Sequence, residues 1–254
     1  MKAMILAAGL GTRLRPLTDN CPKALVEING RTLLEIALSR LRSFGVREAI
    51  VNVHHFAGMI VEYLEANDNF GMTIEVSRED GLLDTGGGLK KAAHFFVEGP
   101  GHPGEPFIVH NVDVLSAIDL RRIVQFHNEN QALATLAVKE RKTSRYLLFD
   151  DQLQLCGRQA GSDGEPELAR PSAIRSSQQA RPLAFCGVQV ISPRLLAMMS
   201  EDGAFSIISS YLRLAALGEK ILAFRADEYY WRDLGTPEGV AQAAQDLRQK
   251  VIAQ

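Results

Sequence analysis

Asp113 is an acidic side chain whose position suits the binding of a divalent cation, and Asp233 is a second acidic residue in a distinctive segment. Asp113 directly follows the apolar segment 107–110, in the stretch NVD, and Asp233 lies within WRDLGTP. Ligands gather at the carboxyl ends of strands in an open α/β sheet, and Mg²⁺ takes carboxylate oxygens together with phosphate oxygens. Taken alone, Asp113 is equally suited to cap a helix over 115–120, and Asp233 to lie in a loop before a helix that Thr236 caps.

Small and basic residues gather near the N-terminus, in a loop whose composition suits phosphate binding. A short apolar strand expected over residues 3–7 leads into AGLGTRLRP, and Pro22-Lys23 follows soon afterwards. Small residues after a parallel strand let the backbone approach a ligand, and successive N–H groups there form an anion-binding nest. Arg13 supplies a planar fork for phosphate oxygens, and Lys23 supplies a point charge.

The two commonest phosphate-binding motifs do not match this loop. A dinucleotide fingerprint needs GxGxxG, but after Gly9 and Gly11 the third position is occupied by Leu14. A Walker loop ends in GK[ST], and that ending is missing here. The missing third glycine therefore argues against a dehydrogenase.

A second small-residue element, Leu83-Asp84-Thr85 followed by Gly86–Gly88, is expected to precede a helix. Glycines before a helix allow a ligand to approach the backbone closely, but they equally suit a flexible helix N-terminus. The residues alone leave both interpretations in place.

Together these motifs resemble the signature of the sugar-phosphate nucleotidylyltransferases. LAAGLGTRLRPLT with Pro22-Lys23 conforms closely over residues 4–23, LDTGGG resembles the element that flanks the base and ribose, and WRDLGTP resembles a late W-x-D-[VIL]-G-T motif. The stretch NVD keeps the family's aspartate but has Val112 where the family usually has glycine. The family's frequent Glu-Lys-Pro element is not recognisable between 140 and 182, which leaves the sugar pocket poorly defined.

The resemblance implies transfer of a nucleoside monophosphate from a nucleoside triphosphate to a sugar 1-phosphate, with release of pyrophosphate. It implies that Mg²⁺ is held by Asp113 and Asp233, and that Arg13, Lys23 and Asp113 are catalytic. Because a phosphate monoester is already anionic, no general base is needed.

Further site residues follow from the resemblance alone. Asn111 and Gly187 are implied to bind the acceptor sugar, and His110 is a further candidate for a place near the substrate. Nucleotide binding is implied for Ala7, Ala8, Gly9, Gly11, Thr12, Arg13, Lys23, Thr85, Gly86 and Gly87.

The resemblance narrows the choice of nucleotide and of acceptor only in part. The compact length and the Ala-Ala-Gly start look most like family members that join UTP and N-acetylmuramate 1-phosphate. GTP with mannose or heptose 1-phosphate, and CTP with choline phosphate or a sugar phosphate, are alternatives because backbone contacts make much of the base choice. A non-catalytic nucleotide sensor or scaffold on the same fold is an alternative of another class. The joint presence of Arg13, Lys23, Asp113 and Asp233 counts against it.

The elements that must position these residues alternate between strands and helices, which indicates a mostly parallel sheet covered on both faces. With the resemblance, this predicts a single Rossmann-like three-layer αβα domain over residues 1–254, of the α/β nucleotide-diphospho-sugar transferase fold, with a small β-rich insertion. Strands are expected at 48–53, 72–77, 106–110, 133–138 and 183–191, and helices at 32–44, 56–67, 119–130, 193–200, 206–217 and 237–251.

The pattern changes after about residue 140. Strands at 145–150 and 153–157 are expected to form a hairpin around Asp150-Asp151. The polar segment 158–182 reads as a loop, either a surface excursion or a lid over the substrate.

Bulk composition excludes several other classes of protein. A formal net charge of -2 provides no general basic field for nucleic acid, and no run reaches the roughly 18 to 20 apolar residues that span a bilayer. Three scattered cysteines argue against a disulfide framework and favour a reducing cytoplasm. Of these, Cys186 is expected to fill core space rather than to react. The sequence makes no prediction of oligomeric state.

Overall fold

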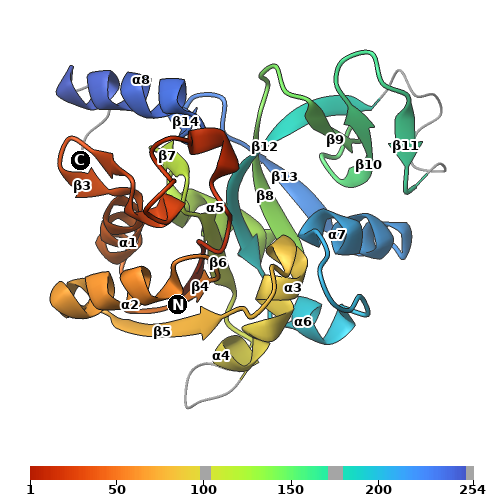
Figure 1. The fold of residues 1–254 in the computed structure, drawn as a ribbon. Helices are drawn as coiled ribbons and strands as arrows, with labels where there is room; N and C mark the ends of the chain where they lie inside the picture. The colour runs from red at the N-terminus through yellow and green to blue at the C-terminus, as the bar shows by residue number, and fades with distance from the viewer. Residues whose placement is uncertain (98–103, 171–179, 250–254) are drawn as a thin grey trace.

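A twisted central sheet forms the middle layer of the computed structural model, which describes residues 1–97, 104–170 and 180–249 (Figure 1). Its parallel part runs in the order β5, β4, β1, β6, and β12 is antiparallel both to β6 and to β8. A further strand, β13, pairs with β8 in parallel. The bounds are β1 Lys2–Leu6, β4 Glu48–Val53, β5 Thr73–Arg78, β6 Phe107–Asn111, β8 Ala134–Lys139, β12 Arg181–Ile191 and β13 Ile221–Arg225.

Helices cover both faces of this sheet because its strands are apolar on both sides. In β1, Ala3 and Ile5 are buried in one core and Met4 in the other. The first core is closed by α1 (Leu33–Ser43), α2 (Ala57–Ala66), α5 (Leu120–Glu129) and α8 (Pro237–Arg248). The second is closed by α3 (Asp84–Lys91), α4 (Ala93–Val97), α6 (Arg194–Met198) and α7 (Ile207–Ala216). The predicted three-layer αβα architecture is confirmed.

Helix ends follow the expected signals. Thr32 caps α1 by accepting a hydrogen bond from the Glu35 N–H at 3.0 Å, and Gly45 follows the helix with φ of 90°. Thr236 caps α8 in the same way, with Pro237 in the first turn. The end predicted for this last helix, residue 251, lies outside the described residues. None of the described helices has the length and apolar character needed to cross a membrane.

The β-rich part consists of β9 (Arg145–Phe149), β10 (Leu155–Ala160) and β11 (Pro166–Leu168), which extend the sheet from the start of β12. The predicted hairpin is confirmed, and Asp150 closes its turn by accepting hydrogen bonds from the N–H groups of Gln152 and Gln154.

The prediction of a loop over 158–182 is wrong in three places. Residues 158–160 and 166–168 are strands, and β12 begins at Arg181. Cross-strand pairing outweighs the polar composition here, since Arg158 lies opposite Glu167 and donates to its carboxylate at 2.7 Å. The alternatives of lid and surface excursion fall mainly on 171–179, outside the described residues.

A short two-stranded ribbon joins β7 (Val114–Ser116) to β14 (Trp231–Asp233), and Figure 1 shows the two side by side. The alternative of a helix over 115–120 is wrong, because residues 114–116 pair with β14 and Asp119 caps α5 instead. Neither strand of this ribbon was predicted. Each is three residues long, too short for a periodic signal.

Helix α5 is tied to the sheet by a buried histidine, His127. Ser192 donates its hydroxyl proton to the Ala132 carbonyl at 2.8 Å, so its oxygen accepts from His127 Nε2 at 2.9 Å. Thr135 then donates to Nδ1 at 3.0 Å, which fixes the neutral tautomer. Burial lowers the pKa of His127 to about 4.

We predict that this histidine makes the protein less stable in acid. The unfolded chain binds its proton near pH 6.5 and the folded chain only near pH 4, so stability is full above the first value and falls as pH drops between them. The free energy of unfolding in urea should decrease by about 1 to 2 kcal/mol from pH 7 to pH 5 through this residue. His127→Gln should flatten the decrease, and the exposed His55→Gln should leave it unchanged. An identical pH profile for the His127 variant would contradict the assignment.

Candidate active site

The N-terminal loop leaves β1 through Ala7 and Ala8, which are both buried. Gly11 has φ of 65°, and a Cβ at this position would lie 2.9 Å from Thr18 Cγ2. Thr18 also donates its hydroxyl to the Gly11 carbonyl at 2.8 Å, which holds the turn. The N–H groups of Gly9, Leu10 and Gly11 donate to no acceptor within the described part of the chain. They form a backbone surface suited to anionic oxygens.

A buried polar pair, Asn52 and Glu79, holds the start of this loop. Asn52 Oδ1 accepts from the Ala7 N–H at 2.7 Å, and its Nδ2 donates to Glu79 Oε1 at 2.7 Å. The other oxygen of Glu79 accepts from the Leu83 N–H at 3.0 Å. The pair therefore connects the loop to the segment before α3, and a Cβ at Gly88 would lie 2.7 Å from both side chains.

Lys23 and Asp113 form an ion pair in which each side chain is only 14% exposed. Lys23 begins the 3₁₀ turn η2 (Lys23–Leu25), and Asp113 follows β6. Arg13, from the turn η1 (Thr12–Leu14), approaches Asp233 with an N–O distance of 3.9 Å. This second pair is exposed, at 64% and 45%, so solvent screens it and both groups remain accessible to a ligand.

The β7–β14 ribbon brings the two aspartates together. Asp233 pairs with Val114, the neighbour of Asp113, and the Leu234 N–H donates to the Asp113 carbonyl at 2.8 Å. Asp233 Oδ1 also accepts from the Gly235 N–H at 2.7 Å, which orients the carboxylate. The sequence could not show that the two residues are neighbours; this pairing places their backbones side by side.

The donor set fits a magnesium ion that substrate phosphates help to hold. Mg²⁺ is usually bound by one or two carboxylates, with phosphates and waters supplying the remaining oxygens. Asp113 and Asp233 provide two such carboxylates, and no group of three or more potential acidic, histidine or cysteine ligands occurs among the described residues.

A cavity of about 730 Å³ opens beside these groups. Six of the predicted site residues line it, namely Arg13, Thr85, Asn111, Asp113, Gly187 and Asp233. Among the described residues the lining does not include Ala7, Ala8, Gly9, Gly11, Thr12, Lys23, Gly86 or Gly87. Lys23 nevertheless reaches this site through its ion pair with Asp113.

The glycines of the second element lie inside α3 and not before it, which corrects the expected helix start. Helix α3 begins at Asp84, and Gly86 donates its N–H to the Phe205 carbonyl at 2.9 Å. A Cβ on Gly86 would lie 2.3 Å from the Phe205 ring, and one on Gly87 would lie 2.4 Å from the Gly203 carbonyl. Close packing against the segment before α7 therefore requires these glycines.

Gly187 and Asn111 lie together on neighbouring strands. Gly187 has φ of 71°, and a Cβ there would meet Val114 Cγ2 at 2.8 Å and Asn111 Nδ2 at 3.0 Å. The glycine thus leaves room at the wall of the cavity beside the asparagine. Val112, which replaces the family's usual glycine, is buried in the core.

His110 and Cys186, which the sequence analysis also considered, are buried and present no reactive group to the cavity. His110 is fully buried, donates from Nδ1 to the Asn111 carbonyl at 2.7 Å, and has its pKa lowered to about 4 by burial and by the charge of Arg40. Burial raises the pKa of Cys186 to about 12, so its thiol stays protonated at neutral pH. Cys186 is a buried core residue, as expected.

Arg141 and Trp231 form a wall of the cavity that the sequence analysis did not assign. The guanidinium of Arg141 lies over the indole ring at 4.1 Å, and Trp231 Nε1 donates to the Cys186 carbonyl at 2.8 Å. Arg141 comes two residues after β8, at the same edge of the sheet as Asn111. The rule that ligands gather at carboxyl ends of strands could have found it.

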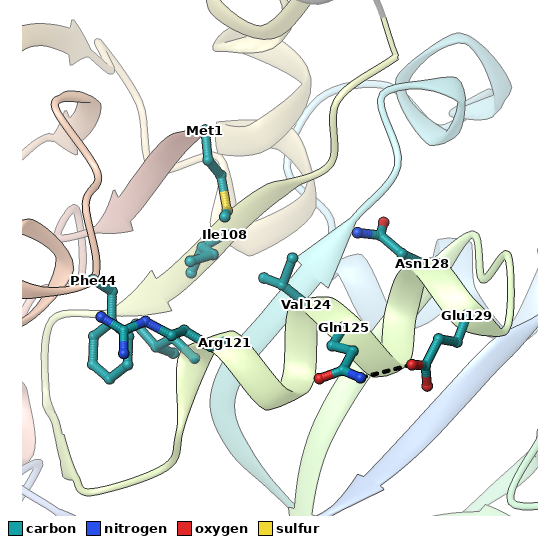
Figure 2. Close-up of a pocket in the computed structure, with 9 residues that line it drawn as sticks. Met1, Phe44, Ile108, Arg121, Val124, Gln125, Asn128 and Glu129 are labelled. Carbon is teal, nitrogen blue, oxygen red and sulfur yellow. Dashed lines mark hydrogen bonds between the residues drawn. The ribbon is translucent and has the colours of Figure 1, made fainter.

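A smaller hollow of about 380 Å³ lies between α5 and the sheet. Figure 2 shows Val124 and Asn128 on the helix, Ile108 on β6, and Arg121 extended over the Phe44 ring. Its lining includes none of the predicted site residues, and we assign it no role.

Comparison with known proteins identifies the class that this fold and site define. The family described as nucleotidyl transferase matches residues 2–148. A solved structure of UDP-glucose pyrophosphorylase complexed with UDP-glucose superimposes with a TM-score of 0.76 at 19% identity, covering 98% of both chains. The chain therefore belongs to the nucleotidyl transferase family.

Two curated relatives are similar over nearly the whole chain. The N-acetylmuramate alpha-1-phosphate uridylyltransferase of Caulobacter vibrioides is 33% identical, covering 93% of this chain and 92% of its own. The enzyme of the same name from Neisseria meningitidis serogroup B is 30% identical, covering 93% and 94%.

We predict that the Asn52–Glu79 pair is a main source of stability in the loop region. Asn52→Ala leaves the Ala7 N–H and a buried Glu79 oxygen unpaired, which should lower the free energy of unfolding by about 2 kcal/mol or more. Urea denaturation measures the change. The exposed Asn128→Ala is the matched control and should stay within about 0.5 kcal/mol of the parent chain. Equal stability of both variants would show that the pair is dispensable.

Proposed function

We infer that this protein transfers a nucleoside monophosphate from a nucleoside triphosphate to a sugar 1-phosphate, releasing pyrophosphate. The observation that carries the proposal is the convergence of Asp113 and Asp233 beside Lys23 and Arg13 at one cavity. Four charged groups of these types are what an enzyme needs in order to bring two phosphate-bearing anions together.

The chemistry is an in-line displacement at phosphorus. An oxygen of the sugar phosphate forms a bond to the α-phosphorus, the bond from that phosphorus to the bridging oxygen breaks, and pyrophosphate leaves with the electron pair. Arg13 and Lys23 balance the negative charge on the triphosphate, and the N–H groups from Gly9 to Gly11 bind its oxygens. No side chain has to remove a proton, which agrees with the protonated thiol of Cys186 and the burial of His110.

Asp113 and Asp233 would hold the Mg²⁺ ion. When bound, the ion supplies positive charge to the reacting phosphate oxygens and helps to orient them. The ion pair with Lys23 orients Asp113, and the hydrogen bond from the Gly235 N–H orients Asp233. The remaining nucleotide contacts are assigned to the backbone of Ala7, Ala8 and Thr12 and to the element Thr85, Gly86 and Gly87, with Asn111 and Gly187 on the sugar.

The substrate pair that we propose is UTP and N-acetylmuramate 1-phosphate. Two curated relatives are similar to this chain over more than nine-tenths of its length and of their own, and both carry the name of this activity. We further propose that the chain acts as one domain, in the cytoplasm, where its free cysteines Cys21, Cys156 and Cys186 stay reduced.

We predict that the purified protein releases pyrophosphate from UTP and N-acetylmuramate 1-phosphate in the presence of Mg²⁺. The assay uses a matrix of UTP, GTP, CTP, ATP and dTTP against sugar 1-phosphates, including those of mannose and heptose, and choline phosphate. Strong turnover of another pair would replace the substrates but keep the reaction. Nucleotide binding without turnover anywhere in the matrix would favour a non-catalytic nucleotide sensor.

We predict that either carboxylate is required for turnover. Asp113→Asn and Asp233→Asn should each lower kcat by roughly 10²- to 10³-fold, because one carboxylate ligand of the ion that stabilises the reacting phosphates is lost. Asp151→Asn, at the exposed turn after β9, is the control and should keep full activity. Thermal unfolding of each variant verifies the fold. Full kcat in either site variant would refute the metal assignment.

A further inference from the structure

Arg141 is a cation held in place by a stacking contact and a hydrogen bond. Its guanidinium lies 4.1 Å over the indole centroid of Trp231, and Nη2 donates to the Phe185 carbonyl at 2.9 Å. The indole is itself anchored, since Nε1 donates to the Cys186 carbonyl at 2.8 Å. A guanidinium held in this way loses little further conformational entropy when it binds an anion.

The position of Arg141 is on the acceptor side of the cavity. Phe185 anchors Arg141 and Cys186 anchors Trp231, and both immediately precede Gly187 on β12. Gly187 in turn lies beside Asn111 on β6. Arg13 and Lys23 reach the site from the N-terminal loop instead. One pair of cations thus comes from the N-terminal loop, and Arg141 lies apart from that pair, beside the residues assigned to the sugar.

The hydrogen-bonding capacity of Arg141 is not used up by these contacts. Its Nε is buried and has no hydrogen-bond partner within the described residues. Two other cations near the cavity already have anionic partners: Lys23 pairs with Asp113, and Arg158 with Glu167. Arg145 also lines the cavity, but it is exposed and its guanidinium has no such anchoring contact within the described residues. A planar fork with an unsatisfied N–H suits a carboxylate or phosphate, which it binds through two parallel hydrogen bonds.

A sugar phosphate that approaches an anionic triphosphate needs a cation of its own. We propose that Arg141 is this cation and binds an oxyanion of the acceptor. The proposal rests on the function proposed above. In N-acetylmuramate 1-phosphate the oxyanion is either the 1-phosphate or the carboxylate of the sugar.

The test is the steady-state kinetics of Arg141→Gln and Arg141→Lys with UTP and N-acetylmuramate 1-phosphate. Loss of a charged hydrogen-bonded contact should raise the acceptor KM roughly tenfold or more in the glutamine variant. The KM for UTP and the dependence on Mg²⁺ should stay within about twofold of the parent. Arg141→Lys keeps the charge but loses the fork and should be intermediate. If the glutamine variant has a lower Tm, the KM values of the lysine variant are compared with those of the parent instead.

Lys142→Gln is the matched control, because Lys142 is an exposed neighbouring cation that is not among the described residues lining the cavity. It should leave both KM values unchanged. Inhibition constants then distinguish the two oxyanions: N-acetylglucosamine 1-phosphate has the phosphate alone, and N-acetylmuramate has the carboxylate alone. The inhibitor whose inhibition constant rises from the parent to Arg141→Gln carries the group that Arg141 binds.

An acceptor KM and inhibition constants that do not change would overturn the proposal. So would an equal rise in the KM for UTP, since that would indicate a general structural role through Trp231. Activity of the parent chain separates this inference from the function on which it rests. Without turnover of any pair in the parent, the function itself fails and the inference with it.

Discussion

The β7–β14 ribbon is the constraint on which the site depends. Asp113 and Asp233 belong to segments far apart in the sequence, and their convergence rests on three paired residues and the hydrogen bond from the Leu234 N–H to the Asp113 carbonyl. Two carboxylates brought together repel each other. The folded chain offsets that repulsion with Lys23 on one aspartate and Arg13 near the other. The N-terminal loop and the late ribbon thus stabilise each other electrostatically.

The same charges that compensate one another in the structure are those that the substrates need. Lys23 and Asp113 are mostly buried, whereas Arg13 and Asp233 are accessible. In the proposed reaction, a triphosphate and its cation would enter a site whose exposed pair exchanges partners at low cost, while the buried pair keeps the geometry fixed. Positioning of this kind, rather than proton transfer, is what a phosphoryl-transfer site requires.

The three-layer fold and the phosphate loop were predictable because their signals are local. Short apolar runs identified β1 and its neighbours, amphipathic spacing identified α1, and Thr236 marked the start of α8. The β7–β14 pairing and the Asn52–Glu79 pair were not predictable, since each depends on contacts between distant segments. The glycines of α3 were expected to precede the helix, and this expectation was wrong for the same reason. They are required by close packing against Phe205, which lies far along the chain.

Counting tightly bound Mn²⁺ ions tests most directly whether Asp113 and Asp233 hold one metal ion between them. Electron paramagnetic resonance counts them in the presence of a UTP analogue with a non-hydrolysable α,β-bridge. We expect the parent chain to bind an ion tightly only when the nucleotide is present, and we expect this ion to be lost in both Asp113→Asn and Asp233→Asn. Binding of Mn²⁺ at parental affinity in Asp233→Asn would contradict the shared metal site, because the two carboxylates would then not hold the same ion.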